Sequence, residues 1–225
     1  MFDESNVLRS FLTDSSKREE LKESLAQLET SYNGKDFWAI VALVKKERIN
    51  DDALLEQIEN ISQRRFREKV HFTLSVPAGN LLEIVITIAA IYLAFQIRTD
   101  WMLYFSALIL MTTLHPLSHY ATGSLFGIRF THYYLNGPAR IEPTLRIDYA
   151  SYLKASGKKR ALMHASGVIG TIAAPLIVAA IAVNRGAGAV AENLFILFLL
   201  LVVFELLTST KIGDLMRARR EYKFR

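Results

Sequence analysis

Long runs of apolar residues alternate with short polar segments through the C-terminal two-thirds of the chain. The runs occupy residues 81–97, 101–126, 161–184 and 191–210. A helix of about 20 residues crosses the roughly 30 Å hydrocarbon core of a bilayer, and each run meets that length within a few residues. Helices are expected because lipid offers no partner to an unpaired backbone amide or carbonyl group. The pattern therefore predicts an all-α integral membrane protein with four transmembrane helices.

Residues 1–75 carry a different pattern, in which apolar residues recur every three or four positions among charged ones. Leu54, Leu55 and Ile58 would share one face of a helix that starts near residues 50–52. Earlier in the chain, Asp36 can cap another helix. We expect a cytosolic helical module here, followed by a membrane domain over residues 76–225. The module is either a packing and topology element or a docking site for a soluble partner.

The segment 127–160, between the second and third runs, alternates apolar and polar residues as strands do. Its alternating apolar residues include Phe130, Tyr134, Ile141 and Leu145. The turn residues Asn136-Gly137-Pro138 separate two strands. Because proline lacks a backbone N–H group, Pro143 restricts its strand to a sheet edge or a break. The segment is therefore expected to form a small β insertion in an otherwise helical protein.

Lys and Arg residues are distributed unevenly around the four runs. Twelve precede the first run, seven lie between the second and third and six follow the fourth, whereas the other two links hold one each. Such residues concentrate on the cytoplasmic side of membrane proteins. We therefore expect a multi-pass protein of the cell membrane, with both termini and the segment 127–160 in the cytoplasm.

The composition narrows the chemistry further. Cysteine is absent, which excludes disulfides, thiolate metal sites and a cysteine nucleophile. The formal net charge of +5 comes from basic residues that flank apolar runs, so the expected partner is the lipid bilayer and not nucleic acid. The sequence also holds no Gly-rich phosphate loop.

Two histidines stand where the second run turns polar. His115 and His119 are four residues apart, so on a helix both imidazoles project from one face and can bind one metal ion. Imidazoles within a membrane segment are costly without partners, which makes a functional site the default hypothesis. On these residues alone, a role in helix packing is the alternative.

Three stretches in the same order resemble the site-2 protease family of intramembrane metalloproteases. They are HPLSHYATGSLFGIRFTHYYLNGP (residues 115–138), HASGVIGT (residues 164–171) and FELLTSTKIGDL (residues 204–215). The resemblance covers roughly residues 101–222, although none of the family's motifs is intact.

The resemblance implies a zinc site and its ligands. His115, His119 and Asp214 would bind the metal, with water as the fourth ligand of an open tetrahedral site. His164 and Glu205 would lie beside these ligands. Topology agrees with this grouping, because the second and fourth runs cross the membrane in the same direction and end on the same side.

The residue after the first histidine departs from the family pattern. The family has a glutamate there, which takes a proton from the zinc-bound water, whereas this chain has Pro116. Losing a general acid–base typically costs about 10²–10⁴-fold in rate. We therefore expect no catalytic residue, and a non-proteolytic relative that binds a membrane-anchored protein client along the predicted strands. The strand residues that would contact the client are Phe130, Tyr134, Ile141 and Leu145.

Two other functions stay open. The first is an active metalloprotease in which another acid replaces the missing glutamate. Glu205 is one candidate, although an unbroken helix would place it about 13 Å from Asp214 along the axis. Glu142 and Asp148 in the cytosolic segment are others. The second function is that of a structural or interaction protein of the membrane whose histidine pair is incidental.

Overall fold

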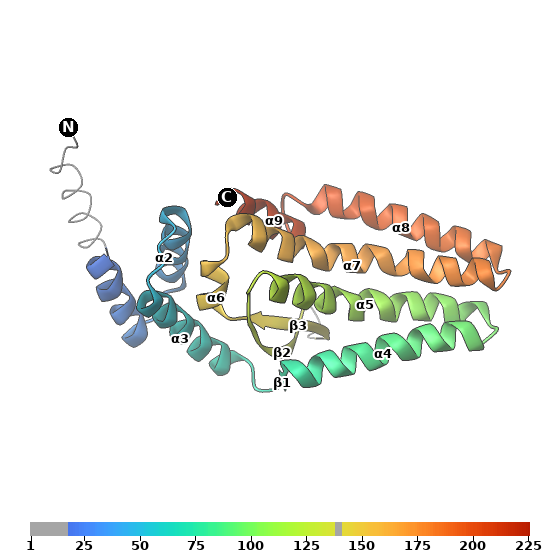
Figure 1. Ribbon diagram of the computed structural model, residues 1–225, viewed down its shortest axis with the longest axis horizontal. Coiled ribbons are helices and arrows are strands. Elements are labelled where there is room, and N and C mark those ends of the chain that lie inside the picture. Colours follow the sequence, from blue (N-terminus) through green and yellow to red (C-terminus); the bar gives the residue numbers. More distant parts are fainter. Residues whose placement is uncertain (1–17, 138–140) are drawn as a thin grey trace. The chain divides into compact units, whose positions relative to one another are not determined.

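The computed structural model describes residues 18–137 and 141–225, and these are mostly helical (Figure 1). The chain divides into two units, Met1–Lys69 and Val70–Arg225.

The first unit is built from helical residues 18–30, α2 (Gly34–Glu47) and α3 (Asp52–Lys69). Apolar residues at helical spacing turn inward from all three helices. The buried residues are Leu21, Leu25, Leu28, Phe37, Ile40, Val41, Val44, Leu54, Leu55, Ile58 and Ile61. The amphipathic pattern thus gives this unit a core of its own.

Side-chain oxygen atoms cap the first turns of α2 and α3, and one of the two predicted caps is correct. α3 begins as expected, because Asp51 Oδ1 accepts a hydrogen bond from the Leu54 amide at 3.1 Å. For α2 the predicted cap, Asp36, is wrong: Asn33 Oδ1 accepts from the Lys35 amide at 2.9 Å. Asp36 lies in the first turn instead, where its charge complements the helix dipole.

Four long helices form most of the second unit. They are α4 (Val76–Gln96), α5 (Asp100–Leu125), α7 (Gly157–Asn184) and α8 (Gly188–Thr208). All four are long and apolar enough to cross a membrane. Each starts one to five residues before the apolar run that predicted it, because local pattern does not fix helix ends to the residue.

The four helices lie side by side in the order α4, α5, α7, α8 (Figure 1). Small residues line much of their shared core, so the helix axes approach closely. The buried core residues are Ala90, Ala94, Leu103, Ala107, Leu110, Ala174, Val178, Ala179, Ile181, Ala182, Val190 and Leu194. At one end of the core, Arg185 Nη1 donates to the Ala94 carbonyl at 2.7 Å.

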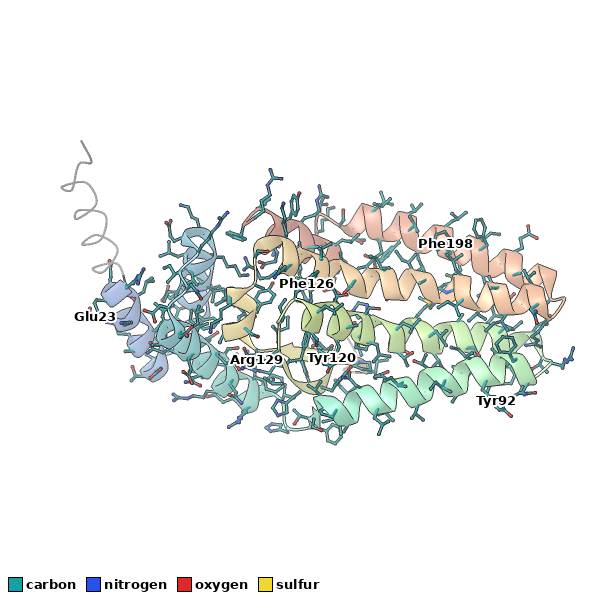
Figure 2. All side chains as sticks on the ribbon, viewed as in Figure 1. Glu23, Tyr92, Tyr120, Phe126, Arg129 and Phe198 are labelled. Carbon is teal, nitrogen blue, oxygen red and sulfur yellow. The ribbon has the colours of Figure 1, made fainter. Side chains whose placement is uncertain are left out.

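The outer faces of α4 and α8 are apolar and exposed. Tyr92 points away from the bundle on α4 and is 60% exposed (Figure 2). The other exposed apolar residues of these helices include Leu81, Leu82, Ile88, Phe95, Phe195, Leu199, Leu200 and Phe204. An apolar surface of this extent is typical of helices that face lipid or a partner.

A three-stranded antiparallel sheet lies at one end of the four helices (Figure 1). Its order is β1 (Leu74–Ser75), β2 (Phe130–Asn136) and β3 (Glu142–Ile147). Pro143 lies on the edge strand β3, as its missing N–H group predicts. Ile141 was predicted to lie in a strand, but β3 begins one residue later and Ile141 is exposed.

Two short helices complete this end of the unit. α6 (Tyr149–Lys154) was not predicted, and Asp148 caps it by accepting from the Ser151 amide at 2.7 Å. α9 (Gly213–Tyr222) follows α8 after a turn and packs against α7.

Gly170 of α7 faces α5 at close range. A Cβ atom there would collide with Ser118 Oγ and would lie 2.6 Å from the Leu114 carbonyl oxygen. Because the carbonyl belongs to the backbone, α5 would have to shift to accept a side chain.

We predict that Gly170→Ala destabilises the protein by about 1–3 kcal/mol, the usual cost of overpacking a core. Thermal unfolding in detergent should show a lower midpoint. Gly188→Ala is the matched control, because nothing lies within 4 Å of a Cβ atom at that position. Equal midpoints for both variants would contradict the close approach of α5 and α7.

Candidate metal centre

α5 carries both histidines on the face that it turns toward α7. The helix continues through Pro116, so the four-residue spacing keeps the two rings adjacent. The ring centroids of His115 and His119 are 4.7 Å apart, and their Nε2 atoms are 3.2 Å apart. The two Nε2 atoms are therefore close enough to bind a single ion.

α7 holds each ring through its other nitrogen. His119 Nδ1–H donates to the Met163 carbonyl oxygen at 2.7 Å. His115 Nδ1 lies 2.9 Å from Thr171 Oγ1, whose hydroxyl donates to the Gly167 carbonyl and so accepts from the imidazole. A proton on each Nδ1 atom leaves Nε2 as the electron-pair donor of a neutral ring. Such partners fix the tautomer of a metal-binding histidine.

Asp214 reaches the same point from α9. α8 ends at Thr208, and the chain turns before α9 begins at Gly213, which has a φ of +82°. Asp214 Oδ2 then lies 3.2 Å from His115 Nε2 and 3.1 Å from His119 Nε2. The other oxygen, Oδ1, accepts from Arg217 Nη1 at 3.0 Å.

The Asp214 carboxyl is anionic at neutral pH. Burial opposes its ionisation, but the neighbouring imidazoles of His115 and His119 outweigh burial and hold the pKa of Asp214 well below its usual range. The site therefore carries a fixed negative charge beside two imidazoles.

Three atoms that carry lone pairs thus converge within 3.2 Å of one another. Bare lone pairs at that distance repel, so a proton on an Nε2 atom or a cation must lie among them. His115, His119 and Asp214 each offer one ligand atom, and these atoms lie within 4.8 Å of one another. Two imidazoles and a carboxylate form a ligand set that can bind a metal ion.

A cavity of about 210 Å³ opens beside the three ligands. β3 supplies another part of its wall, through Glu142, Pro143, Thr144, Leu145 and Ile147. Of the other predicted strand residues, Phe130 lines the cavity, whereas Tyr134 and Ile141 do not. Pro116, the residue after the first histidine, and Arg217 also line it.

His164 lies near Asp214. Its Nδ1 is 3.9 Å from Asp214 Oδ1, and its Nε2 is 2.9 Å from the Tyr152 hydroxyl. Glu205 lies on α8, outside the cavity lining, and interacts electrostatically with Asp214 and His115.

Glu142 and Asp148, the other two candidates for a catalytic acid, have different surroundings. Glu142 is exposed and lines the cavity. Asp148 caps α6 and pairs with Arg129 at 3.4 Å, so its carboxylate has a structural role.

Several residues of the site escaped the sequence analysis. The Met163 carbonyl has no sequence signature, because every residue has one. Thr171 lies four residues after Gly167, on the face of α7 that meets α5. This helical spacing in the sequence could have indicated that Thr171 faces the histidines. Arg217 lies one helical turn after Asp214, which is the usual spacing for a local ion pair.

Comparisons of the chain with protein-family models, with curated proteins and with solved structures found no match.

We predict that Thr171→Val lowers metal affinity by about 10- to 100-fold, as is typical when a partner of a ligand is removed. Valine keeps the shape of the side chain but cannot accept the His115 proton. Titration of the purified protein with zinc against a competing chelator measures the effect. Thr112→Val is the control, because that hydroxyl donates to the Ile109 carbonyl of its own helix, away from His115. Unchanged affinity in Thr171→Val would show that His115 needs no such partner.

Proposed function

We propose that this chain is a multi-pass membrane protein of the site-2 protease type that holds zinc, lacks proteolytic activity and binds a membrane-anchored client. One observation carries the proposal. The Nε2 atoms of His115 and His119 and the Oδ2 atom of Asp214 converge within 3.2 Å beside a cavity, and Pro116 occupies the position of the family's general base.

A membrane location is supported by the four apolar helices and by the exposed apolar faces of α4 and α8. The distribution of Lys and Arg supports the orientation, with both termini, the sheet and the metal centre on the cytoplasmic side of the cell membrane. The lipid bilayer is thus the first partner that we assign.

Zinc is the metal that suits this ligand set. Two neutral imidazoles and one carboxylate, with a fourth position open to a cavity, match the composition of open tetrahedral zinc sites. Zinc in such a site lowers the pKa of a bound water and polarises a carbonyl group. The residues of this chain contribute the rest, because α7 orients both rings and Arg217 binds the outer oxygen of Asp214.

A protein client is supported by the position of β3. β3 is an edge strand of the sheet and also lines the cavity beside the ligands. An extended chain that adds to such an edge gains main-chain hydrogen bonds, and its side chains select between pockets. A client bound there would pass the metal centre without being cut, because Pro116 cannot accept a proton.

An active metalloprotease is the second candidate, and one observation favours it. An unbroken helix would keep Glu205 about 13 Å from Asp214 along its axis, but α8 ends at Thr208 and the chain turns before Asp214. Among the described residues, no hydrogen bond or ion pair holds the Glu205 carboxylate, which leaves it free to act as a base.

Metal content tests the centre itself. The wild-type protein, purified through a tag without histidine, should contain about one zinc per chain, and Asp214→Ala should lose it. His71→Ala is the control, because His71 is exposed and lies outside the cavity. Absence of zinc from the wild type, even after incubation with the metal, would favour an incidental histidine pair.

Cleavage of a co-expressed single-span protein separates the two candidates. We expect no cleavage by the wild type, and Pro116→Glu, if it still holds zinc, is expected to gain activity because it restores the missing acid–base group. Cleavage by the wild type that stops in His115→Ala would overturn the non-proteolytic function. Loss of that cleavage in Glu205→Gln would then assign the base.

A further inference from the structure

α9 carries Asp214 on a short helix that follows a turn. Gly213, at its first position, has a φ of +82°, and nothing lies within 4 Å of a Cβ atom there. The chain therefore turns sharply into α9, and contacts along the helix orient it. One of them is the hydrogen bond from Arg219 Nη1 to Ser209 Oγ at 3.1 Å.

A buried contact lies at the other end of α9. Glu221 Oε2 accepts from Arg160 Nε at 2.6 Å, and the two side chains are only 8% and 3% exposed. Seven residues separate Asp214 from Glu221, which is nearly two full turns or about 10 Å of helix. The two acids therefore share the face of α9 that meets α7.

Arg160 is itself fixed on the protein. Its Nη1 donates to the carbonyl oxygens of Leu153 and Ala155, and its guanidinium lies 5.5 Å from the centre of the Tyr152 ring. Gly157, one turn earlier on α7, allows the α9 backbone to come close. A Cβ atom on Gly157 would lie 2.5 Å from the Glu221 carbonyl oxygen.

A second connection runs from the pair back to the ligand. Burial, and next the charge of Glu221, raise the pKa of the Tyr152 phenol well above its usual value, so the hydroxyl keeps its proton. That hydroxyl lies 2.9 Å from His164 Nε2, and His164 Nδ1 lies 3.9 Å from Asp214 Oδ1. Tyr152 and His164 thus lie between the pair and Asp214, and the last step is a 3.9 Å approach that is longer than a hydrogen bond.

We propose that the Arg160–Glu221 pair positions Asp214 and thereby sets the metal affinity of the centre. α7 then fixes all three ligands: Thr171 binds His115, the Met163 carbonyl binds His119, and Arg160 holds the helix that carries Asp214. Arg160 and Glu221 are positioning residues, since neither offers an atom to the metal. The inference rests on the proposed metal site.

Zinc affinity and the visible spectrum of the cobalt-substituted protein test the pair. In Glu221→Gln we expect affinity to fall by about 10- to 100-fold, as for other partners outside the ligand set, and the tetrahedral cobalt bands to change. Arg220→Gln is the matched control, because it removes a charge from an exposed position on the same helix. Its affinity and spectrum should equal those of the wild type.

Two further variants separate positioning from folding. An unpaired Arg160 is expected to destabilise the protein, whereas replacing both members of a buried pair by apolar residues is often neutral. The double variant Arg160→Met/Glu221→Leu should therefore unfold near the wild-type temperature. Its zinc affinity should nevertheless be lower than that of the wild type. Gly157→Ala shifts α9 without changing any charge and should weaken zinc binding as well.

The outcomes also distinguish this inference from the proposed function. A wild-type protein without zinc would overturn the metal site. If the wild type binds zinc, and folded double-variant or Gly157→Ala protein binds it within twofold of the wild type with the same cobalt spectrum, only the positioning role is overturned.

Discussion

The direct packing of α5 against α7 is the contact on which the bundle and the candidate metal centre both depend. Gly167 and Gly170 place no side chain between the two helices. The His119 ring fills the space beside Gly167 and reaches the Met163 carbonyl at 2.7 Å. The same closeness lets Thr171 meet His115. Helix contact by small residues, a common device in membrane proteins, thus becomes a means of orienting two imidazoles.

The centre is asymmetric in its surroundings. α7 provides a partner for each Nδ1 atom, and Arg217 of α9 binds the outer oxygen of Asp214. The Nε2 atoms and Asp214 Oδ2 instead meet beside the cavity, where the edge strand β3 leaves room for a ligand. Polar side chains near a membrane segment are tolerated when they are paired or face a cavity, and these residues satisfy both conditions.

Much of this arrangement could be predicted from the sequence, because its signals are local. Long, mostly apolar runs located the four long helices, and a four-residue spacing placed His115 and His119 on one face. The order of the stretches brought Asp214 into the same group, and the structure places it 3.1 Å from His119.

The remainder could not be predicted, because it depends on contacts between distant residues or on backbone atoms. The two-residue strand β1 is too short to show alternation. Glu221 and Arg160 are 61 residues apart, and each alone resembles an ordinary surface charge. Asp36 and Ile141 failed for a smaller reason, since local pattern does not fix the ends of elements to the residue.

The separation of the ligands along the chain has a consequence for biogenesis. Asp214 follows His119 by 95 residues, so during translation both histidines leave the ribosome well before the carboxylate does. Until α9 is made, the chain offers two imidazoles at this point but no carboxylate. Because a domain folds as a unit, the full set of three candidate ligands forms only when α9 docks on α7.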